Sequence, residues 1–196
     1  MRSRLLAGIA AAFALLTATG GLAAPLYGND PDGMFGAGRP GGNLFGGSSP
    51  VPRTTVTYPT NHKPGTIVVN TAERRLYLVL GNGQALRYGI GVGRDGFTWS
   101  GVKTVTSKRE WPSWTPPEQM LRRRPDLPRF MPGGPDNPLG ARALYLGSTL
   151  YRIHGSNEPE TIGQAVSSGC FRLTNEDVID LYERVNVGAT VVVQQH

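Results

Sequence analysis

The sequence predicts a mainly β fold of the β-rich α+β class, with one clear helix near its C-terminal end. Twenty-seven glycines and 16 prolines among 196 residues favour a loop-rich β domain over a helical bundle. Short β-branched or alternating stretches recur from residue 66 onward, and both patterns are typical of strands. The length suits one domain with its own core.

The first 24 residues are predicted to be a secretory signal. A basic start precedes an apolar run at 5–16, and small residues follow it, so we expect cleavage near Ala23 or Ala24. A membrane anchor is the alternative, but the run is too short to cross a hydrocarbon core of about 30 Å. We therefore expect an exported protein of the periplasm or cell envelope, without stable membrane insertion once the signal is removed.

The folded domain is predicted to span residues 63–194. Residues 25–62, between the signal and this domain, are rich in Gly, Pro, Ser and Asn and lack hydrophobic periodicity, which predicts a flexible linker.

The domain is predicted to open with a β-hairpin. Alternation over 74–80 places Leu76, Leu78 and Leu80 on one face of a strand, and Gly81-Asn82-Gly83 supplies the positive φ angles of a tight turn. The expected strands are 66–69, 74–80, 84–92, 102–107, 142–146, 149–153 and 190–193.

One helix is predicted, from Thr174 to about Val185. Thr174 and Asp177 have the spacing of a capping box, which satisfies backbone N–H groups at a helix start. The 3.6-residue period predicts a buried face formed by Val178, Ile179, Tyr182 and Val185.

The insert at 110–140 contains eight prolines and is predicted to be a long surface loop, of the kind that often forms a lid or a binding loop. Its surroundings are basic, because residues 103–129 hold seven Lys or Arg against three Asp or Glu. A basic surface suits cell-wall polymer, acidic lipid or nucleic acid. Export makes nucleic acid the least favoured of these partners, and a merely solvated face is the alternative.

Two motif matches fail on context, and a zinc-ligand pattern is missing. Gly91–Gly96 matches a dinucleotide-binding pattern but is not followed by a helix start. Ser100–Lys103 matches the Ser-x-x-Lys pattern but lacks its companion elements. One cysteine and three histidines give no zinc-ligand cluster. We therefore expect no metal and no cofactor.

Cys170, the single cysteine, follows His154 by 16 positions, a spacing that suits one loop folding back on itself. In an oxidising compartment a single cysteine has no intramolecular disulfide partner. An adjacent imidazole would take the thiol proton and activate the sulfur as a nucleophile. The alternative is a packed cysteine and a hydrogen-bonded histidine that never meet.

The segments HGSN at 154–157 and SSGCFR at 167–172 resemble the signature of the L,D-transpeptidase catalytic domain family (YkuD-type, ErfK/YbiS-like). The family pattern is a His, then a loop, then Ser-His-Gly-Cys, an Arg two residues on and an Asn shortly afterwards. The resemblance extends over about 64–193 and implies an L,D-transpeptidase-like β-sandwich with the helix after the cysteine.

By this resemblance Cys170 is the nucleophile and His154 its general base and later acid. The Gly155 carbonyl would orient the imidazole, and the backbone amides of Gly169 and Cys170 would hold the oxyanion. Arg172 matches the family arginine associated with positioning and with a substrate carboxylate; a structural ion pair is the alternative for it.

Ser168 departs from the family pattern, because it stands where a second histidine is common. The change leaves the main dyad intact but removes a second imidazole. Ser167, Ser168, Asn157, Trp111 and Trp114 are further candidates for substrate contact.

The implied reaction is acyl transfer on peptidoglycan stem peptides. The cysteine attacks the carbonyl of the third-position L-centre, releases D-Ala and passes the acyl group to an amine of another stem peptide or of an envelope protein. Two alternatives remain at this point: a non-catalytic cell-wall-binding module, and a cysteine carboxypeptidase or amidase in which water resolves the thioester.

Overall fold

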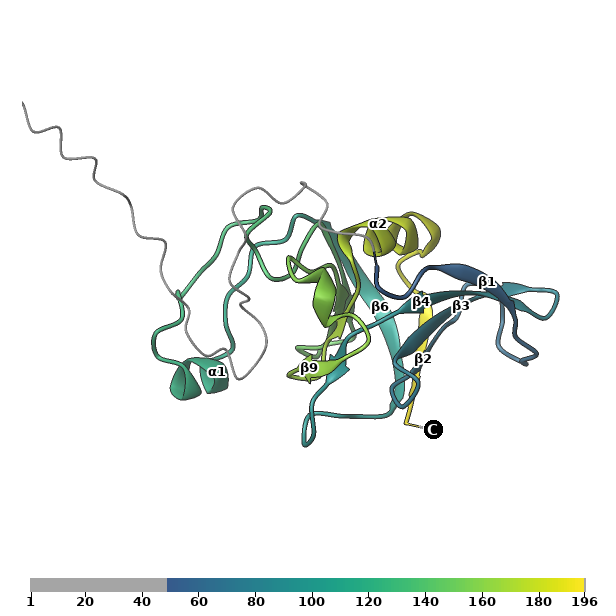
Figure 1. The fold of residues 1–196 in the computed structure, drawn as a ribbon, viewed down its shortest axis with the longest axis horizontal. Helices are drawn as coiled ribbons and strands as arrows, with labels where there is room; N and C mark the ends of the chain where they lie inside the picture. The colour runs from purple at the N-terminus through teal and green to yellow at the C-terminus, as the bar shows by residue number, and fades with distance from the viewer. Residues whose placement is uncertain (1–48, 196) are drawn as a thin grey trace, which may run out of the picture.

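The computed structural model of the protein describes residues 49–195 (Figure 1). The predicted signal and residues 25–48 of the predicted linker lie outside the described residues. Strands predominate, beside one long helix, α2 (Asn175–Arg184), one short helix, α1 (Glu118–Arg123), and a 3-10 turn at Pro159–Thr161. The predicted β-rich class is therefore confirmed.

The main sheet has the strand order β1-β4-β3-β2-β11-β6-β7-β8-β10, and β5 pairs with β9 in a separate small sheet. The bounds are β1 Thr54–Thr57, β2 Ile67–Asn70, β3 Arg75–Gly81, β4 Gln84–Gly89, β5 Val92–Gly93, β6 Gly101–Glu110, β7 Arg142–Leu146, β8 Arg152–His154, β9 Ala165–Ser167, β10 Phe171–Arg172 and β11 Thr190–Gln194.

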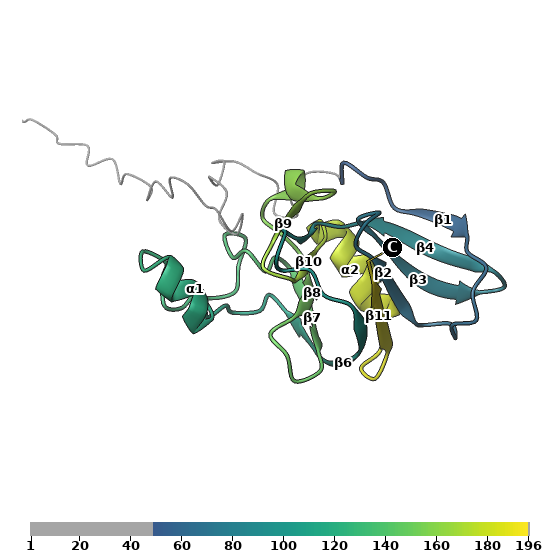
Figure 2. The ribbon, with the colours of Figure 1, turned by 90° about the horizontal axis from the view of Figure 1, so that it is seen from below.

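Strand β6 connects two halves of the main sheet. Its first half pairs with β11 and its second half with β7, and the register shifts between Val105 and Ser107. Such an irregularity bends a strand and increases its twist. Helix α2 lies in the angle between the two halves (Figures 1 and 2), and its Val178 and Leu181 join a core to which both halves contribute.

The predicted hairpin is present as β3 and β4, and Gly81, Asn82 and Gly83 all have positive φ. One side chain departs from the predicted alternation. Leu80 is exposed while its neighbour Val79 is buried, because the register shifts between Val79 and Gly81. A bulge at that point reverses the side chains that follow it.

Two predicted strands are shorter than expected. The return strand predicted at 84–92 ends at Gly89, after which Val92–Gly93 forms β5 and pairs with β9. The strand predicted at 149–153 begins only at Arg152, because the Thr149 hydroxyl donates to the Leu146 carbonyl (2.6 Å) and closes a turn.

The predicted linker was wrong over its last part, since Thr54–Thr57 forms strand β1 and pairs with β4. Three of these four residues are threonine, whose branched Cβ favours strands. The Gly, Pro, Ser and Asn content of residues 25–62 as a whole predicted a linker, although this short run favours a strand. The chain is therefore ordered before residue 63.

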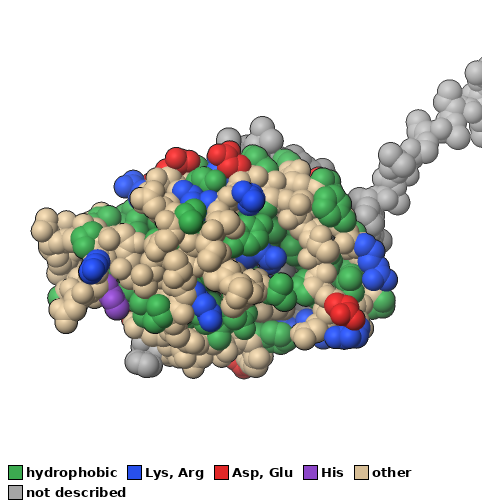
Figure 3. Space-filling model, turned by 180° about the vertical axis from the view of Figure 1, so that it is seen from behind, with side chains coloured by type: hydrophobic (Ala, Val, Ile, Leu, Met, Phe, Trp, Pro, Cys, Tyr) green, Lys and Arg blue, Asp and Glu red, His purple; other side chains and the backbone are tan. Residues whose placement is uncertain are grey.

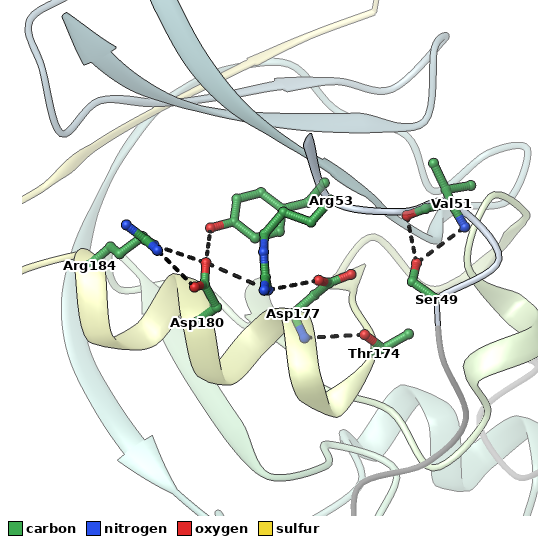
Figure 4. A network of polar contacts seen from close by, with 8 residues as sticks. Ser49, Val51, Arg53, Thr174, Asp177, Asp180 and Arg184 are labelled. Carbon is green, nitrogen blue, oxygen red and sulfur yellow. Dashed lines mark hydrogen bonds and ion pairs between the residues drawn. The ribbon is translucent and has the colours of Figure 1, made fainter. Parts of the chain in front are cut away.

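Arg53, just before β1, forms polar contacts with helix α2 (Figure 4). Its guanidinium donates to Asp177 (3.1 Å) and lies 3.6 Å from Asp180. Asp180 also accepts hydrogen bonds from Tyr88 of β4 and from Arg184. Burial raises the pKa of Asp177, and the positive charge of Arg53 opposes that rise.

Helix α2 begins as predicted, because the Thr174 hydroxyl accepts a hydrogen bond from the Asp177 N–H (3.2 Å). Its buried face is only partly the predicted one. Val178 and Val185 are fully buried, but Leu181 completes that face. Ile179 and Tyr182 are half-buried at its margin.

The insert at 110–140 is more regular than the predicted loop. It contains α1 and a small core of its own, in which Trp114, Met120, Leu127 and Leu139 pack together. Arg124 is buried in the insert and pairs with Asp126 (2.8 Å). On the face seen in Figure 3, basic side chains are spread across the surface and not gathered at one end.

No helix within residues 49–195 is both long enough and apolar enough to cross a membrane.

We expect Arg53→Ala to lower the free energy of unfolding by about 1–3 kcal/mol, because it leaves the buried Asp177 carboxylate without its cation. Urea unfolding at pH 7 measures the effect. Arg184→Ala is the matched control, since it removes an exposed partner of the same Asp180 cluster and should cost about 0.5 kcal/mol or less. Equal losses in both variants would contradict the anchoring role of Arg53.

Candidate active site

The site is built on two short parallel strands, β8 and β10. Phe171 pairs with Ile153 and Arg172 with His154. Extending this register by one residue sets Cys170 beside Arg152. The chain between the strands therefore folds back as one loop and returns the cysteine to the strand that carries the histidine.

His154 ends β8 and is completely buried. Its Nδ1 lies 2.6 Å from the carbonyl oxygen of Gly155. A carbonyl can only accept, so Nδ1 carries the proton and Nε2 has the free lone pair of a base. Within residues 49–195, Nε2 has no hydrogen-bond partner. The strand end and the Gly155 carbonyl thus fix both the ring orientation and the tautomer.

Burial, together with the positive charges of Arg172 and Arg152, lowers the pKa of His154 to about 3. The hydrogen bond to the Gly155 carbonyl acts in the opposite direction and raises this pKa. The imidazole is therefore neutral at pH 7. A neutral imidazole can accept a proton, which is the state that a general base requires.

Cys170 is a free thiol with only 8% of its surface exposed. Burial raises the pKa of Cys170, while Arg152 and Arg172 act in the opposite direction. The thiol donates to the carbonyl oxygen of Leu150, 3.6 Å from the sulfur. In this resting state the thiol and the imidazole are both neutral and lie on neighbouring strands.

The turn before Cys170 is tightly fixed. The Ser167 hydroxyl donates to the Cys170 carbonyl (2.6 Å) and accepts from the Gly169 N–H (3.2 Å). Gly169 has a φ of +102°, and a Cβ there would lie 2.7 Å from the Tyr151 ring. The Trp99 indole donates to the Gly169 carbonyl (2.8 Å). These contacts set the position of the sulfur and already occupy the Gly169 N–H.

A cavity of about 340 Å³ opens beside Cys170. Ser168 lies in its wall, and its buried hydroxyl oxygen has no hydrogen-bond partner within residues 49–195. The volume is in the range of small-molecule and peptide sites. The lining residues come from four segments: Phe97; Trp114, Pro117, Gln119, Met120 and Arg123 of the insert; Thr149, Leu150, Tyr151 and Arg152; and Ser168 and Cys170.

Arg172 has the structural role that was the alternative for it. It is 1% exposed, and its guanidinium forms an ion pair with the buried carboxylate of Glu158 (3.0 Å). This arrangement favours the structural ion pair over the predicted contact with a substrate carboxylate, because the charge is turned inward and paired inside the loop.

Some of the other candidate contacts line the cavity and some do not. Trp114 lines the cavity as a buried apolar wall. Trp111 does not line it, and its backbone has a φ of +38° beside Gly133. Asn157 also lies away from the cavity, where its side-chain amide donates to the Asp136 carbonyl (3.4 Å).

Sequence reasoning missed Arg152, which lines the cavity next to Cys170. Strand alternation carries a signal for it, because residues two apart on β8 point to the same face and His154 is one of them. It also missed the role of Asn175, whose side-chain oxygen accepts from the Ala141 N–H (2.8 Å) and packs against Gly155.

Within residues 49–195, no three His, Cys, Asp or Glu side chains come together as a metal site would require.

Comparisons with known proteins place most of the chain in one family. The model of the YkuD L,D-transpeptidase catalytic domain matches residues 64–193. The probable L,D-transpeptidase ErfK/SrfK of Escherichia coli is 39% identical over 178 residues, which cover 84% of this chain. The chain spans only 56% of the length of that relative.

Two solved structures are also similar. An L,D-transpeptidase from Mycobacterium smegmatis matches with a TM-score of 0.54 at 17% identity, over 66% of this chain and 58% of that one, and supports the fold alone. A Brucella melitensis protein, called a probable carnitine operon oxidoreductase, is 47% identical with a TM-score of 0.51, over 75% of this chain and 96% of that one.

We expect the protein to lose stability as the pH falls below about 6.5, because the unfolded His154 takes up a proton that the buried ring binds only near pH 3. This one group contributes a slope of at most about 1.4 kcal/mol per pH unit. In His154→Gln the free energy of unfolding, measured with urea from pH 7.5 to 4.5, should decrease less steeply as the pH falls.

His62→Gln is the matched control, since that imidazole is exposed. Identical pH slopes for His154→Gln and the unaltered protein would show that the ring is not buried in its neutral form.

Proposed function

The chain belongs to the YkuD family of L,D-transpeptidase catalytic domains, and on this basis we propose that it is itself a cysteine-dependent L,D-transpeptidase of the cell envelope. The observation that carries the proposal is the neutral His154, held by the Gly155 carbonyl, on the strand next to Cys170 at the edge of a cavity. Peptidoglycan stem peptides are the proposed substrates.

In the first step Nε2 of His154 takes the thiol proton, and the Cys170 sulfur attacks a carbonyl carbon of the donor peptide. By family analogy this carbonyl belongs to the L-configured centre of the third stem residue. The C–N bond to D-Ala breaks, His154 returns the proton to the leaving amine, and a thioester remains. The starting state supports this order, because the neutral imidazole can accept the proton.

In the second step an amine attacks the thioester and restores the thiol. The amine belongs to another stem peptide, which yields a crosslink, or to an envelope protein, which yields a covalent anchor. Both acceptors are uncharged when they react, so His154 can take the surplus proton of the attacking amine and return it to the sulfur.

We assign the oxyanion contact to the backbone N–H of Cys170. The Gly169 N–H, predicted as its partner, is occupied by the Ser167 hydroxyl and would have to exchange that bond first. The buried Ser168 hydroxyl in the cavity wall is a second candidate donor, since it lacks a partner among the described residues. Such donors stabilise the charge that develops on the carbonyl oxygen.

An oxidoreductase, the activity in the name of the Brucella melitensis protein, has less support from this chain. A dinucleotide site of the usual kind needs a glycine-rich turn between a strand and a helix that faces the pyrophosphate. Here Gly91–Gly96 lies around the two-residue strand β5, and the next element is strand β6. The cysteine and histidine, by contrast, have an immediate role in acyl transfer.

The proposal predicts that a β-lactam of the carbapenem class acylates the mature protein, because a thiolate can open the strained ring. Intact-mass measurement should show a single adduct, which Cys170→Ala abolishes and which His154→Gln slows at least about 100-fold. Ser107→Ala, on a strand away from the cavity, should react at the normal rate.

Transfer is distinguished from hydrolysis by digesting sacculi after incubation with the purified protein. New crosslinked peptides or peptide–protein adducts, identified by mass spectrometry, support the transpeptidase. Shortened stems alone would indicate the cysteine carboxypeptidase, and binding to sacculi without any β-lactam adduct would indicate the cell-wall-binding module.

The insert is proposed to act as a lid over the donor peptide and to contact the acidic polymer through its exposed cations. Arg124 cannot serve, because it is buried against Asp126. Arg122 and Arg123 lie further out on the insert, and Arg123 also lines the cavity with its charge over the Phe97 ring, 5.6 Å from the ring centre.

We therefore expect replacing Arg122 and Arg123 together by Gln to reduce activity on sacculi by about tenfold more than activity on a short soluble stem peptide. Added salt should reduce the difference, since exposed charges are screened. Arg109→Gln on strand β6 serves as a control for net charge. Equal losses on polymer and peptide would rule out a polymer contact by these two residues.

A further inference from the structure

One cation of the cavity has no role in the function just described. Arg152 lies on β8, two residues before His154, and lines the same cavity as Cys170. The parallel register of β8 and β10 sets the two side by side, because Phe171 pairs with Ile153. A guanidinium is thus built into the strand that faces the reactive sulfur.

The side chain is held in place by packing. The Arg152 guanidinium lies 5.3 Å from the centre of the Tyr145 ring, on the neighbouring strand β7 with which Arg152 pairs. Its Nε is buried, and no acceptor for it lies within residues 49–195. An arginine placed in this way keeps a hydrogen-bond donor in reserve for an anion that forms only during reaction.

The charged groups around the sulfur leave Arg152 as the principal candidate for that task. Arg172 also lies near Cys170, but its charge is neutralised by the buried Glu158 carboxylate. Arg123 lines the cavity from the insert, with its charge over the Phe97 ring, and His154 is neutral. Among the described residues, no Asp or Glu lines the cavity.

We propose that Arg152 stabilises the negative charge of the Cys170 thiolate and so determines how much of the nucleophile is ionised near neutral pH. The proposal deepens the function described above and rests on Cys170 as its nucleophile. The charge of Arg152 favours the ionised sulfur and works against the burial that raises the pKa of Cys170.

The proton that leaves the sulfur goes to Nε2 of His154, so the ion pair formed is a thiolate and an imidazolium. Arg152 sits beside the negative member of this pair, and its charge also disfavours the positive member. Its net benefit therefore depends on lying closer to the sulfur than to the ring, as the register and the shared cavity wall place it.

The test is the pH dependence of Cys170 alkylation by iodoacetamide, followed by intact mass from about pH 5 to about pH 10. The chain has one cysteine, so the label reports this sulfur alone. Arg152→Met retains the apolar stem over Tyr145 and removes the charge. It should raise the midpoint, the pH at which the alkylation rate reaches half of its maximum, by about one pH unit. Alkylation at pH 7 should slow about tenfold, with the rate at high pH unchanged.

Arg152→Lys should shift the midpoint less than Arg152→Met, because it keeps a charge without the fork of donors. Arg109→Met removes an exposed charge on β6, outside the cavity, and should leave the midpoint unchanged. Repeating the series with His154→Gln separates the contribution of the imidazole. A folded Arg152→Met or Arg152→Gln protein with an unaltered midpoint overturns the proposal.

A purely structural role would change access to the sulfur, and hence the rate at high pH, without moving the midpoint. Alkylation needs no peptidoglycan, so this result is independent of the acyl-transfer tests. If Arg152→Met shifts the midpoint but the protein forms no crosslinked products on sacculi, the role of Arg152 is supported and the transpeptidase activity is not.

Discussion

The site depends on the parallel pairing of β8 with β10. This pairing closes the loop between His154 and Cys170, and it does so with only two residue pairs. Such a short pairing would be weak alone, but Phe171 and Ile153 belong to the main core, and the buried Arg172–Glu158 ion pair ties the loop to the strand. The loop, its ion pair and the two reactive side chains therefore form one packed unit, in which the geometry of the sulfur is fixed before any substrate binds.

Burial gives this unit its chemistry. It keeps the imidazole neutral, so that the ring can accept a proton, and it also keeps the thiol protonated, which makes the nucleophile weak at rest. Two cations near the sulfur oppose the second effect. Arg172 is matched by a carboxylate, whereas Arg152 faces the cavity. Burial and the nearby cations thus act in opposite directions on the ionisation of the sulfur.

The parts that surround the site are also held by contacts between distant segments. The insert packs on its own small core around Trp114 and supplies one wall of the cavity. Outside the insert, Arg53 joins the segment that leads into β1 to α2 through Asp177. Helix α2 in turn presents Asn175 to the segment at Gly155. One helix therefore contacts both the N-terminal segment and the segment next to the histidine.

Local chemistry was enough to predict several parts of the fold and the site from the residues alone. Residue alternation predicted the hairpin, the Thr174 cap predicted the start of α2, and the 16-residue spacing with its glycines predicted a loop that brings Cys170 to His154. Other features required tertiary contacts: which way Leu80 points after a bulge, that Thr54–Thr57 finds a partner in β4, that Arg172 meets Glu158 and that Arg152 faces the sulfur. Each of these depends on a partner strand or a buried charge, and neither is encoded in the residues next to it.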